Sequence, residues 1–223
     1  LDGGAGNDTM SGGDGSDIYY VRDTGDVVSE TNATASTGGT DTVYSYLAAY
    51  TLGTNVENGR IVSTGATNLT GNSLGNTLYA GAGNNVLDGG TGTDTVSYAY
   101  GVSGTTGVTV SLAVAGAQAT GGSGSDTLLN IENLIGSSYA DTLTGNSLAN
   151  ILDGGAGNDT LDGGAGSDAL TGGTGADTFR FSTTLGSSNL DTVNGYVLVD
   201  DTIQLENAVF AKLTVTGTLA AAN

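Results

Sequence analysis

The most constraining feature of the sequence is a nine-residue step. From residue 136 the chain divides without interruption into GSSYADTLT, GNSLANILD, GGAGNDTLD, GGAGSDALT and GGTGADTFR. Blocks at 3–29 and 71–97 follow the same step, and single units occur at 36–44 and 121–129. Most units have glycine first and Asp or Asn sixth. A fixed short period indicates a repeat architecture in which each unit packs only on its neighbours.

The eighth position of the unit predicts the core, because it is apolar in nearly every unit. Its residues are Met10, Tyr19, Val28, Leu78, Leu87, Val96, Leu128, Leu143, Leu152, Leu161, Leu170 and Phe179. The residues around it can form a short strand, and the glycine-rich residues before it can form a tight turn with positive φ. The glycine density argues against helix. We therefore predict an all-β chain, a flattened parallel β-roll or β-solenoid in which two units make one coil.

Interruptions of the nine-residue step divide the chain into four predicted segments. Residues 1–44 hold a first repeat block with decayed units, and residues 45–135 hold a second block with irregular β connections. Residues 136–181 hold the third and most regular block. Residues 182–223 are expected to form a C-terminal β cap on the last repeat.

The charge of the chain predicts a bound cation. Four Lys and Arg face 23 Asp and Glu, and the net charge of −19 opposes compaction unless positive charge is taken up. Nineteen of the acids are Asp, and short carboxylates beside glycines are typical of ligands in turns. The alternative, an acidic disordered tail, would have fewer Val, Ile, Leu and Tyr and would carry its acids in runs. Clustered basic residues are absent, so we expect no nucleic-acid partner.

The missing residue types exclude several functions. Without histidine or cysteine, the chain cannot build an H-E-x-x-H zinc site, a Ser-His-Asp triad or a thiol nucleophile. We therefore expect it not to be an enzyme, with paired carboxylates in a glycosidase-like role as the remaining alternative. Tyr44, Tyr46 and Tyr50 could stack on a sugar, but we expect them to line the thin core. No apolar run reaches the roughly 18 residues of a membrane span, and the sequence reads as an internal piece of a longer protein.

A Gly-x-Gly-x-Asp turn offers the oxygens that calcium prefers, about six to eight at about 2.3 to 2.6 Å. Glycine at positions two and four lets main-chain carbonyls point inward, and Asp at position six reaches the same place. The glycines expected at calcium sites are Gly4, Gly6, Gly13, Gly15, Gly90, Gly92, Gly155, Gly157, Gly164, Gly166, Gly173 and Gly175. The side chains expected to bind calcium are Asp8, Asp17, Asp26, Asp94, Asp126, Asp141, Asn150, Asp159, Asp168 and Asp177.

If two units make a coil, turns on the same side lie 18 residues apart, and a metal between them takes one side chain from each. This spacing pairs Asp141 with Asp159, Asn150 with Asp168, Asp159 with Asp177, Asp8 with Asp26, and Asn76 with Asp94. Asn85 has no carboxylate at that separation. Because Asn brings no charge, we expect the strongest binding around 154–177 and the weakest around 71–97. The alternative is that the sixth residue only caps its own turn without metal, and the Asp residues at position nine are expected to be solvated.

The tandem units at 3–20 and 154–180 resemble the RTX nonapeptide, G-G-x-G-x-D-x-U-x. Asn55-Val-Glu-Asn58 and Asn130-Ile-Glu-Asn133, each followed by a weak and then a strong repeat, are also similar to segments of RTX tails. The stretch from Phe179 to Leu205 is similar to the cap of such proteins, although Asn194, Gly195 and Tyr196 stand where the family usually has Asp-Phe. The resemblance implies a β-roll that binds several Ca²⁺ ions, leaves the cell unfolded through a type I secretion apparatus, and folds outside.

Two classes of parent protein remain open. The chain can be the tail of a secreted hydrolase or polysaccharide-modifying enzyme, where it supports export and folding. It can instead be the structural repeat region of a surface adhesin, surface-layer or filament protein, with self-association through sheet edges. Either parent is extracellular or on the cell surface, where calcium modules bind at roughly 0.1 to 1 mM. About five such ions would reduce the charge of −19 to about −9.

Overall fold

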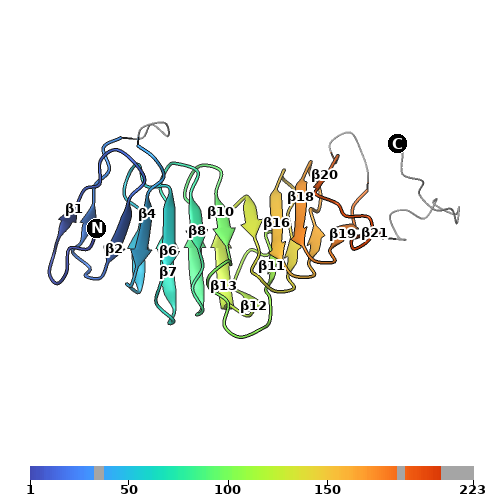
Figure 1. Ribbon diagram of the computed structural model, residues 1–223, viewed down its shortest axis with the longest axis horizontal. Helices are drawn as coiled ribbons and strands as arrows, with labels where there is room; N and C mark the ends of the chain where they lie inside the picture. The colour runs from blue at the N-terminus through green and yellow to red at the C-terminus, as the bar shows by residue number, and fades with distance from the viewer. Residues whose placement is uncertain (33–37, 185–188, 207–223) are drawn as a thin grey trace, which may run out of the picture.

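The structure is a computed structural model that describes residues 1–32, 38–184 and 189–206. Within these ranges every regular element is a β-strand, which confirms the all-β prediction. No helix in this part of the chain is long and apolar enough to cross a membrane. The strands are stacked side by side along an elongated body, from the blue N-terminal end to the orange-red C-terminal end (Figure 1).

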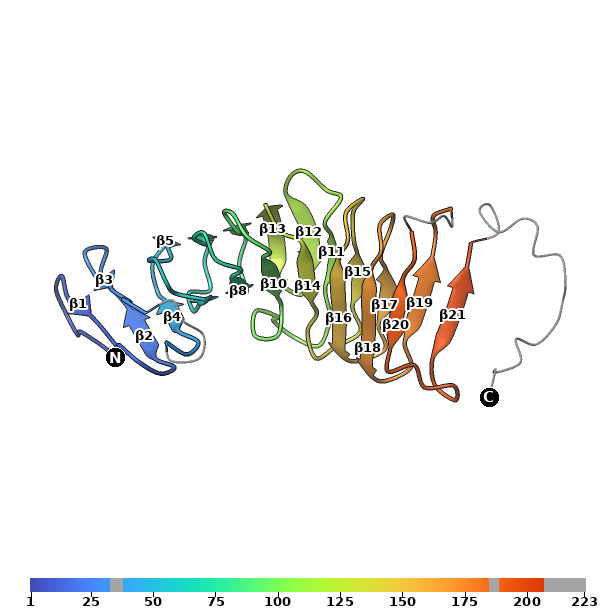
Figure 2. The ribbon, with the colours of Figure 1, turned by 90° about the horizontal axis from the view of Figure 1, so that it is seen from above.

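One face of the roll is a continuous parallel sheet of nine strands. In spatial order these are β2 (Ile18–Val21), β4 (Thr42–Ser45), β6 (Asn58–Ile61), β8 (Thr77–Tyr79), β10 (Thr95–Ser97), β14 (Asn133–Ile135), β16 (Ile151–Ala156), β18 (Ala169–Thr174) and β20 (Thr192–Asn194). The sheet passes through all the repeat blocks without a break, and its C-terminal half is seen in Figure 2.

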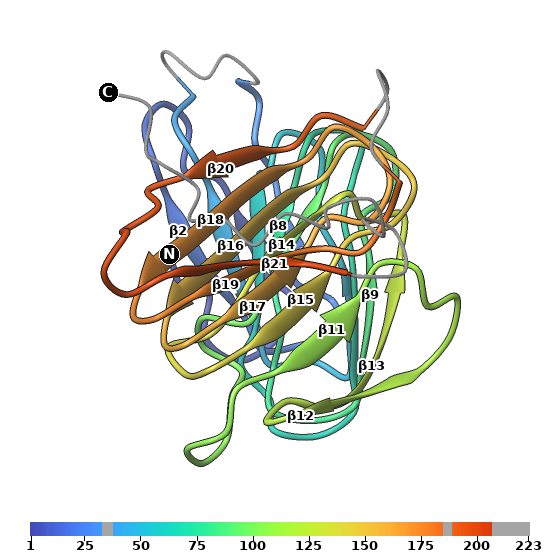
Figure 3. The same cartoon turned by 90° about the vertical axis from the view of Figure 1, so that its right-hand side faces the viewer.

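The opposite face consists of three shorter sheets. The first pairs β1 (Thr9–Met10) with β3 (Val27–Val28), and the second contains β5 (Ala49–Thr51), β7 (Thr67–Thr70), β9 (Asn85–Asp88), β13 (Gly124–Leu129) and β12 (Gln118–Gly121). The third contains β11 (Thr109–Ser111), β15 (Thr142–Thr144), β17 (Thr160–Asp162), β19 (Thr178–Phe181) and β21 (Thr202–Leu205). Their pairs are parallel except for the hairpin β12–β13. Figure 3 looks along the roll and shows the β15–β17–β19 layer beside the β16–β18–β20 layer.

The register of the strands confirms that two units make one coil. Leu143 lies opposite Leu161, which is 18 residues later, and Leu161 lies opposite Phe179. On the other face Leu152 lies opposite Leu170. The fold of the RTX-like repeats is therefore the predicted parallel β-roll.

The core is the row of position-eight side chains between the two faces. All twelve predicted core residues are buried, from Met10 to Phe179. Period-two alternation explains why so few apolar residues suffice, because successive residues of a strand point to opposite sides. In β16, for example, Leu152 is fully buried while its neighbour Ile151 is 55% exposed.

The prediction that the three tyrosines line the core is wrong for Tyr44 and Tyr46. Val43 takes the inward position of β4, so its neighbour Tyr44 faces outward and its ring centroid lies 5.3 Å from that of Tyr20. Tyr46 is 38% exposed, and the Arg22 guanidinium lies over its ring at 4.4 Å. Tyr50 packs partly buried against the core.

The predicted cap continues both faces of the roll. Strand β20 pairs with β18, and β21 pairs with β19. Residues 185–188 and 207–223 of the predicted cap lie outside the described residues.

Candidate calcium site

Position-six side chains form a ladder along each side of the roll. In each step, the main-chain N–H of one residue donates to a side-chain oxygen one coil later. The predicted pairs are joined in this way: Asp141 to Asp159 at 2.8 Å, Asn150 to Asp168 at 2.8 Å, Asp159 to Asp177 at 2.9 Å, Asn76 to Asp94 at 2.7 Å, and Asp8 to Asp26 at 3.2 Å. The structure therefore brings together every pair that the 18-residue spacing selected.

Other members of the ladders do not follow from that spacing, and three of them illustrate why. The N–H of Asn85 donates to Asp126 Oδ1 at 2.8 Å, because the β11–β12 insertion places the next coil 41 residues later. Glu57 and Glu132 replace the usual Asp and accept the N–H groups of Asp41 and Asp94, each at 2.8 Å. Sequence reasoning did not assign these two glutamates, although the repeated N-x-E-N segment was the available signal.

The second oxygen of the position-six carboxylate distinguishes two kinds of turn. In the turn 154–159, Gly155 and Gly157 have φ of +95° and +137°, a region that favours glycine. The N–H of Gly155 donates backward to Asp153 Oδ1 at 3.1 Å, away from Asp159. Asp159 Oδ2 is consequently buried with no hydrogen-bond partner. We call a turn an open turn when its second and fourth positions are glycines with positive φ.

The open turns coincide with the predicted glycine sites. They span residues 3–8, 12–17, 89–94, 154–159, 163–168 and 172–177, and all twelve predicted glycines in them have positive φ. Buried carboxylate oxygens without a partner occur in five of these turns, at Oδ2 of Asp8, Asp94, Asp159, Asp168 and Asp177. In these five turns, one buried carboxylate oxygen therefore remains available to a ligand beside the turn.

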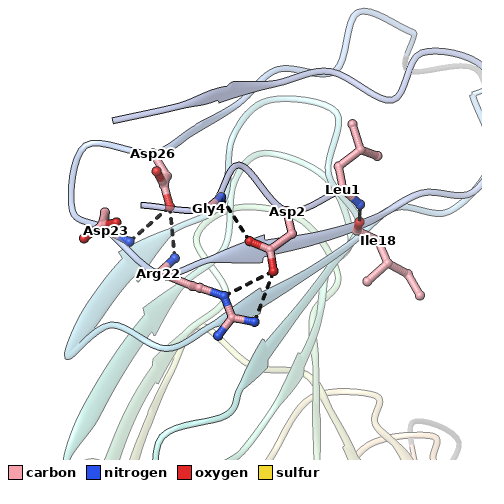
Figure 4. A network of polar contacts seen from close by, with 7 residues as sticks. All are labelled: Leu1, Asp2, Gly4, Ile18, Arg22, Asp23 and Asp26. Atoms are coloured by element: carbon pink, nitrogen blue, oxygen red, sulfur yellow. Dashed lines mark hydrogen bonds and ion pairs between the residues drawn. The ribbon is translucent and has the colours of Figure 1, made fainter. Parts of the chain in front are cut away.

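Aspartates at position nine contribute to this geometry. Asp88, Asp153 and Asp162 were expected to be solvated, but Oδ1 of each accepts the N–H of the glycine two residues later at 3.1 to 3.2 Å. Asp2 does the same for Gly4 at 3.2 Å, and it also pairs with Arg22 (Figure 4).

Other turns are closed, because the N–H at position two donates to the position-six side chain. The N–H of Asn146 donates to Asn150 Oδ1 at 2.8 Å, and Asn150 Nδ2 donates to the Glu132 carbonyl at 2.7 Å. The N–H of Arg22 donates to Asp26 Oδ2 at 2.9 Å in the same way (Figure 4).

Two further predicted ligands also have both oxygens engaged. Asp141 accepts the N–H groups of Val108 and Ser137 at 2.6 and 2.5 Å, one on each oxygen. Asp126 accepts the Asn85 N–H on Oδ1 and the Thr120 hydroxyl on Oδ2. These side chains, with Asp26 and Asn150, thus differ from the open-turn aspartates.

Glycine at position one leaves a cradle beside the free oxygen. A Cβ on Gly154 would lie 2.4 Å from Asp159 Oδ2 and 2.6 Å from the carbonyl oxygen of Gly172 in the next coil. Both oxygens are acceptors only, so their convergence is unfavourable without a cation. Carboxylate and carbonyl oxygens are the donors that calcium prefers, and the residues present therefore fit this ion.

The electrostatics of the open turns are those of uncompensated acids. Burial, reinforced by nearby carboxylates, raises the pKa of Asp159 and of Asp168 to about 6. By contrast, main-chain N–H donors lower the pKa of Asp26. The ion pairs among the described residues join Arg22 to Asp2 and Arg180 to Asp162 and Glu206, so none of them neutralises a position-six carboxylate.

Comparison with known protein families matches four copies of the RTX calcium-binding nonapeptide repeat, at residues 1–28, 65–99 and 144–179. The chain carries RTX repeats in these three regions. The three matched regions contain all the open turns, and the RTX chain is thus a calcium-binding repeat module. No curated protein matches the chain.

Proposed function

We propose that this RTX chain is a non-catalytic module that folds when it meets millimolar calcium outside the cell, and that it supports the export and stability of a larger extracellular protein. The observation that carries the proposal is the set of buried, unpartnered Oδ2 atoms in the open turns. They make the folded state depend on a cation that the described side chains do not supply.

Each part of an open turn has a distinct role in this proposal. The position-six aspartates Asp8, Asp94, Asp159, Asp168 and Asp177 hold the ion with Oδ2. All of them except Asp8 also accept a main-chain N–H of the neighbouring coil on Oδ1. The left-handed glycines turn the position-two N–H away, so that it does not compete for the carboxylate. Calcium, when bound, supplies two positive charges and links oxygens of successive coils.

This arrangement suits a chain that must stay unfolded inside the cell. A ligand that binds only the folded state stabilises it according to its free concentration. Sites with roughly 0.1 to 1 mM affinity remain largely unoccupied at cytosolic calcium concentrations and fill outside. The RTX resemblance supports export through a type I secretion apparatus, and the net charge of −19 supports an expanded chain before calcium is bound.

The parent protein is a secreted enzyme with this module as its tail, or a surface protein in which the roll is the structural body. Strand β20 ends one side of the nine-stranded sheet of the described residues, and such an end can pair with a further strand. This feature supports self-association in a surface or filament protein.

The proposal is tested by measuring the hydrodynamic radius and protease resistance of the chain in calcium-stripped buffer and at millimolar calcium, with magnesium as the matched control. We expect a compact, resistant species with calcium, an expanded and rapidly cleaved species without it, and little effect of magnesium, which demands a stricter octahedral geometry. Equal compactness in all three buffers would reject calcium-driven folding.

A further inference from the structure

A group of three carboxylates near the N-terminus differs from the sites in the paired turns. One carboxylate oxygen from each of Asp17, Glu30 and Asp41 lies within 4.8 Å of the other two, and no other such acidic group occurs among the described residues. We propose that these residues form a separate Ca²⁺ site built around Glu30. The site requires a glutamate that the nonapeptide pattern does not contain, so it goes beyond the function proposed above.

The fold brings the three residues together from successive coils. Asp17 ends the open turn 12–17, and its N–H donates to Asp41 Oδ1 at 2.8 Å. Glu30 begins the unit that follows residues 21–29, at the position where other units have glycine. Its Oε1 accepts the N–H of Gly12, its counterpart one coil earlier, at 3.1 Å.

Two buried polar atoms at this group have no hydrogen-bond partner among the described residues. Glu30 is only 4% exposed, and its Oε2 is buried without a hydrogen bond. The Tyr19 hydroxyl is also buried and unpartnered. It belongs to the same site, because a Cβ on Gly12 would lie 2.1 Å from Asp17 Oδ2 and 2.4 Å from the Tyr19 hydroxyl oxygen.

Charge and spacing together select calcium. Glu30 and Asp41, at 4% and 1% exposure, are buried acids, and the ion pairs of the described residues involve neither of them nor Asp17. Burying carboxylates without a counter-ion is costly, whereas oxygens within 4.8 Å of one another can share an ion at about 2.3 to 2.6 Å. Three carboxylates give this site more negative charge than an Asp pair, and affinity rises with the number of charged ligands. We therefore expect it to bind first in a titration.

The test uses Glu30→Gln, which keeps an acceptor for the Gly12 N–H but removes the charge, and Glu30→Gly, which restores the residue usual at position one. Glu132→Gln is the matched control, because Glu132 also accepts a ladder N–H but is not part of a group of three carboxylates. Bound calcium is counted by calorimetry on the full chain. Terbium, excited through tyrosine, reports whether an ion lies beside Tyr19.

We expect both Glu30 variants to lose one ion and the tightest component of binding, with about a tenfold or greater weakening, together with most of the early terbium signal. Glu132→Gln should retain the ion, the tightest component of binding and the early terbium signal. An unchanged ion count, first affinity and terbium signal in the Glu30 variants would overturn the proposal. The experiment distinguishes failure of the Glu30 site from failure of calcium-driven folding. If only the Glu30 site exists, the chain binds a single ion that requires Glu30 and gains no β structure. If only calcium-driven folding holds, the Glu30 variants fold with the full number of ions.

Discussion

The main-chain N–H of Asp159 donates to Asp177 Oδ1 at 2.9 Å, while Oδ2 of Asp177 is buried without a partner. One carboxylate thus ties two coils together with one oxygen, while its other oxygen stays without a hydrogen-bond partner. The same division occurs in Asp168, which accepts the N–H of Asn150.

Asp159→Asn should remove bound calcium and raise the calcium concentration needed for folding. The amide keeps an oxygen for the N–H of Asp141 but loses the charge that the ion requires. We expect at least one ion fewer and about a tenfold higher midpoint. Asp153→Asn removes the same charge from the last residue of the preceding unit, yet Asp153 holds the Gly155 N–H and not the ion. Equal losses in the two variants, measured by calorimetry, would count against the assignment of Asp159.

Alanine at the glycines with positive φ should destabilise the calcium-loaded fold, and the loss of stability should be larger where the new Cβ also meets another atom. Gly6 has φ of +114° and open space around it, so Gly6→Ala should cost about 1 to 2 kcal/mol through backbone strain alone. Gly173→Ala should cost more, because its Cβ would lie 1.9 Å from the Gly155 carbonyl oxygen. Gly65 has neither problem, and Gly65→Ala should change stability by less than about 0.5 kcal/mol. Chemical denaturation at saturating calcium measures all three, and the reverse order would contradict the turn geometry.

Two neighbouring residues of β16 provide a test of the core. Leu152→Ala should lower the unfolding free energy by about 2 to 5 kcal/mol, because it leaves a cavity between the faces of the roll. Ile151→Ala changes the adjacent, mostly exposed side chain and should cost much less. Similar losses for both, measured by denaturant unfolding at fixed calcium, would mean that the two faces do not enclose the predicted row of side chains.

The calcium-free fold should become more stable as the pH falls. The pKa of Asp159 and of Asp168 is raised to about 6 in the folded chain from an ordinary value of 3.8, so the folded state binds protons more tightly than the unfolded state. This stabilisation is complete below the ordinary value and is lost as the pH rises through about 6. In calcium-stripped buffer, where we expect the chain to be largely unfolded at pH 8, far-ultraviolet circular dichroism should show more β signal at pH 5 than at pH 8. Asp159→Asn combined with Asp168→Asn should remove much of the difference, and a full pH dependence in this double variant would contradict the assignment.

The repeat made the fold predictable from sequence, because residues at the same position of successive nine-residue units have the same structural environment. The burial of position eight and the 18-residue register follow directly from the period. The glycine sites were also predictable, since positive φ has a strong residue preference. The outward direction of Tyr44 followed from the same alternation, but an aromatic side chain was assumed to prefer the core.

The side-chain partners of the turns were less predictable. Asn150 and Asp159 occupy the same position of the repeat, but only the structure shows that the Asn150 amide is engaged on both sides while Asp159 keeps a free oxygen. The pairing of Asn85 with Asp126 depends on an insertion whose path no short period specifies. Glu30 was not predicted for a related reason, because it replaces a glycine in a decayed unit and acts only through its neighbours one coil away.

Calcium-driven folding is tested by a calcium titration of the chain followed by far-ultraviolet circular dichroism, with bound ions counted by calorimetry in the same buffer. We predict a cooperative change from coil to β signal near millimolar calcium, uptake of several ions over the same range, and full reversal by chelator. A β signal that is already complete without calcium and unaffected by it would contradict calcium-driven folding, because the open-turn aspartates would then be structural caps and not calcium ligands.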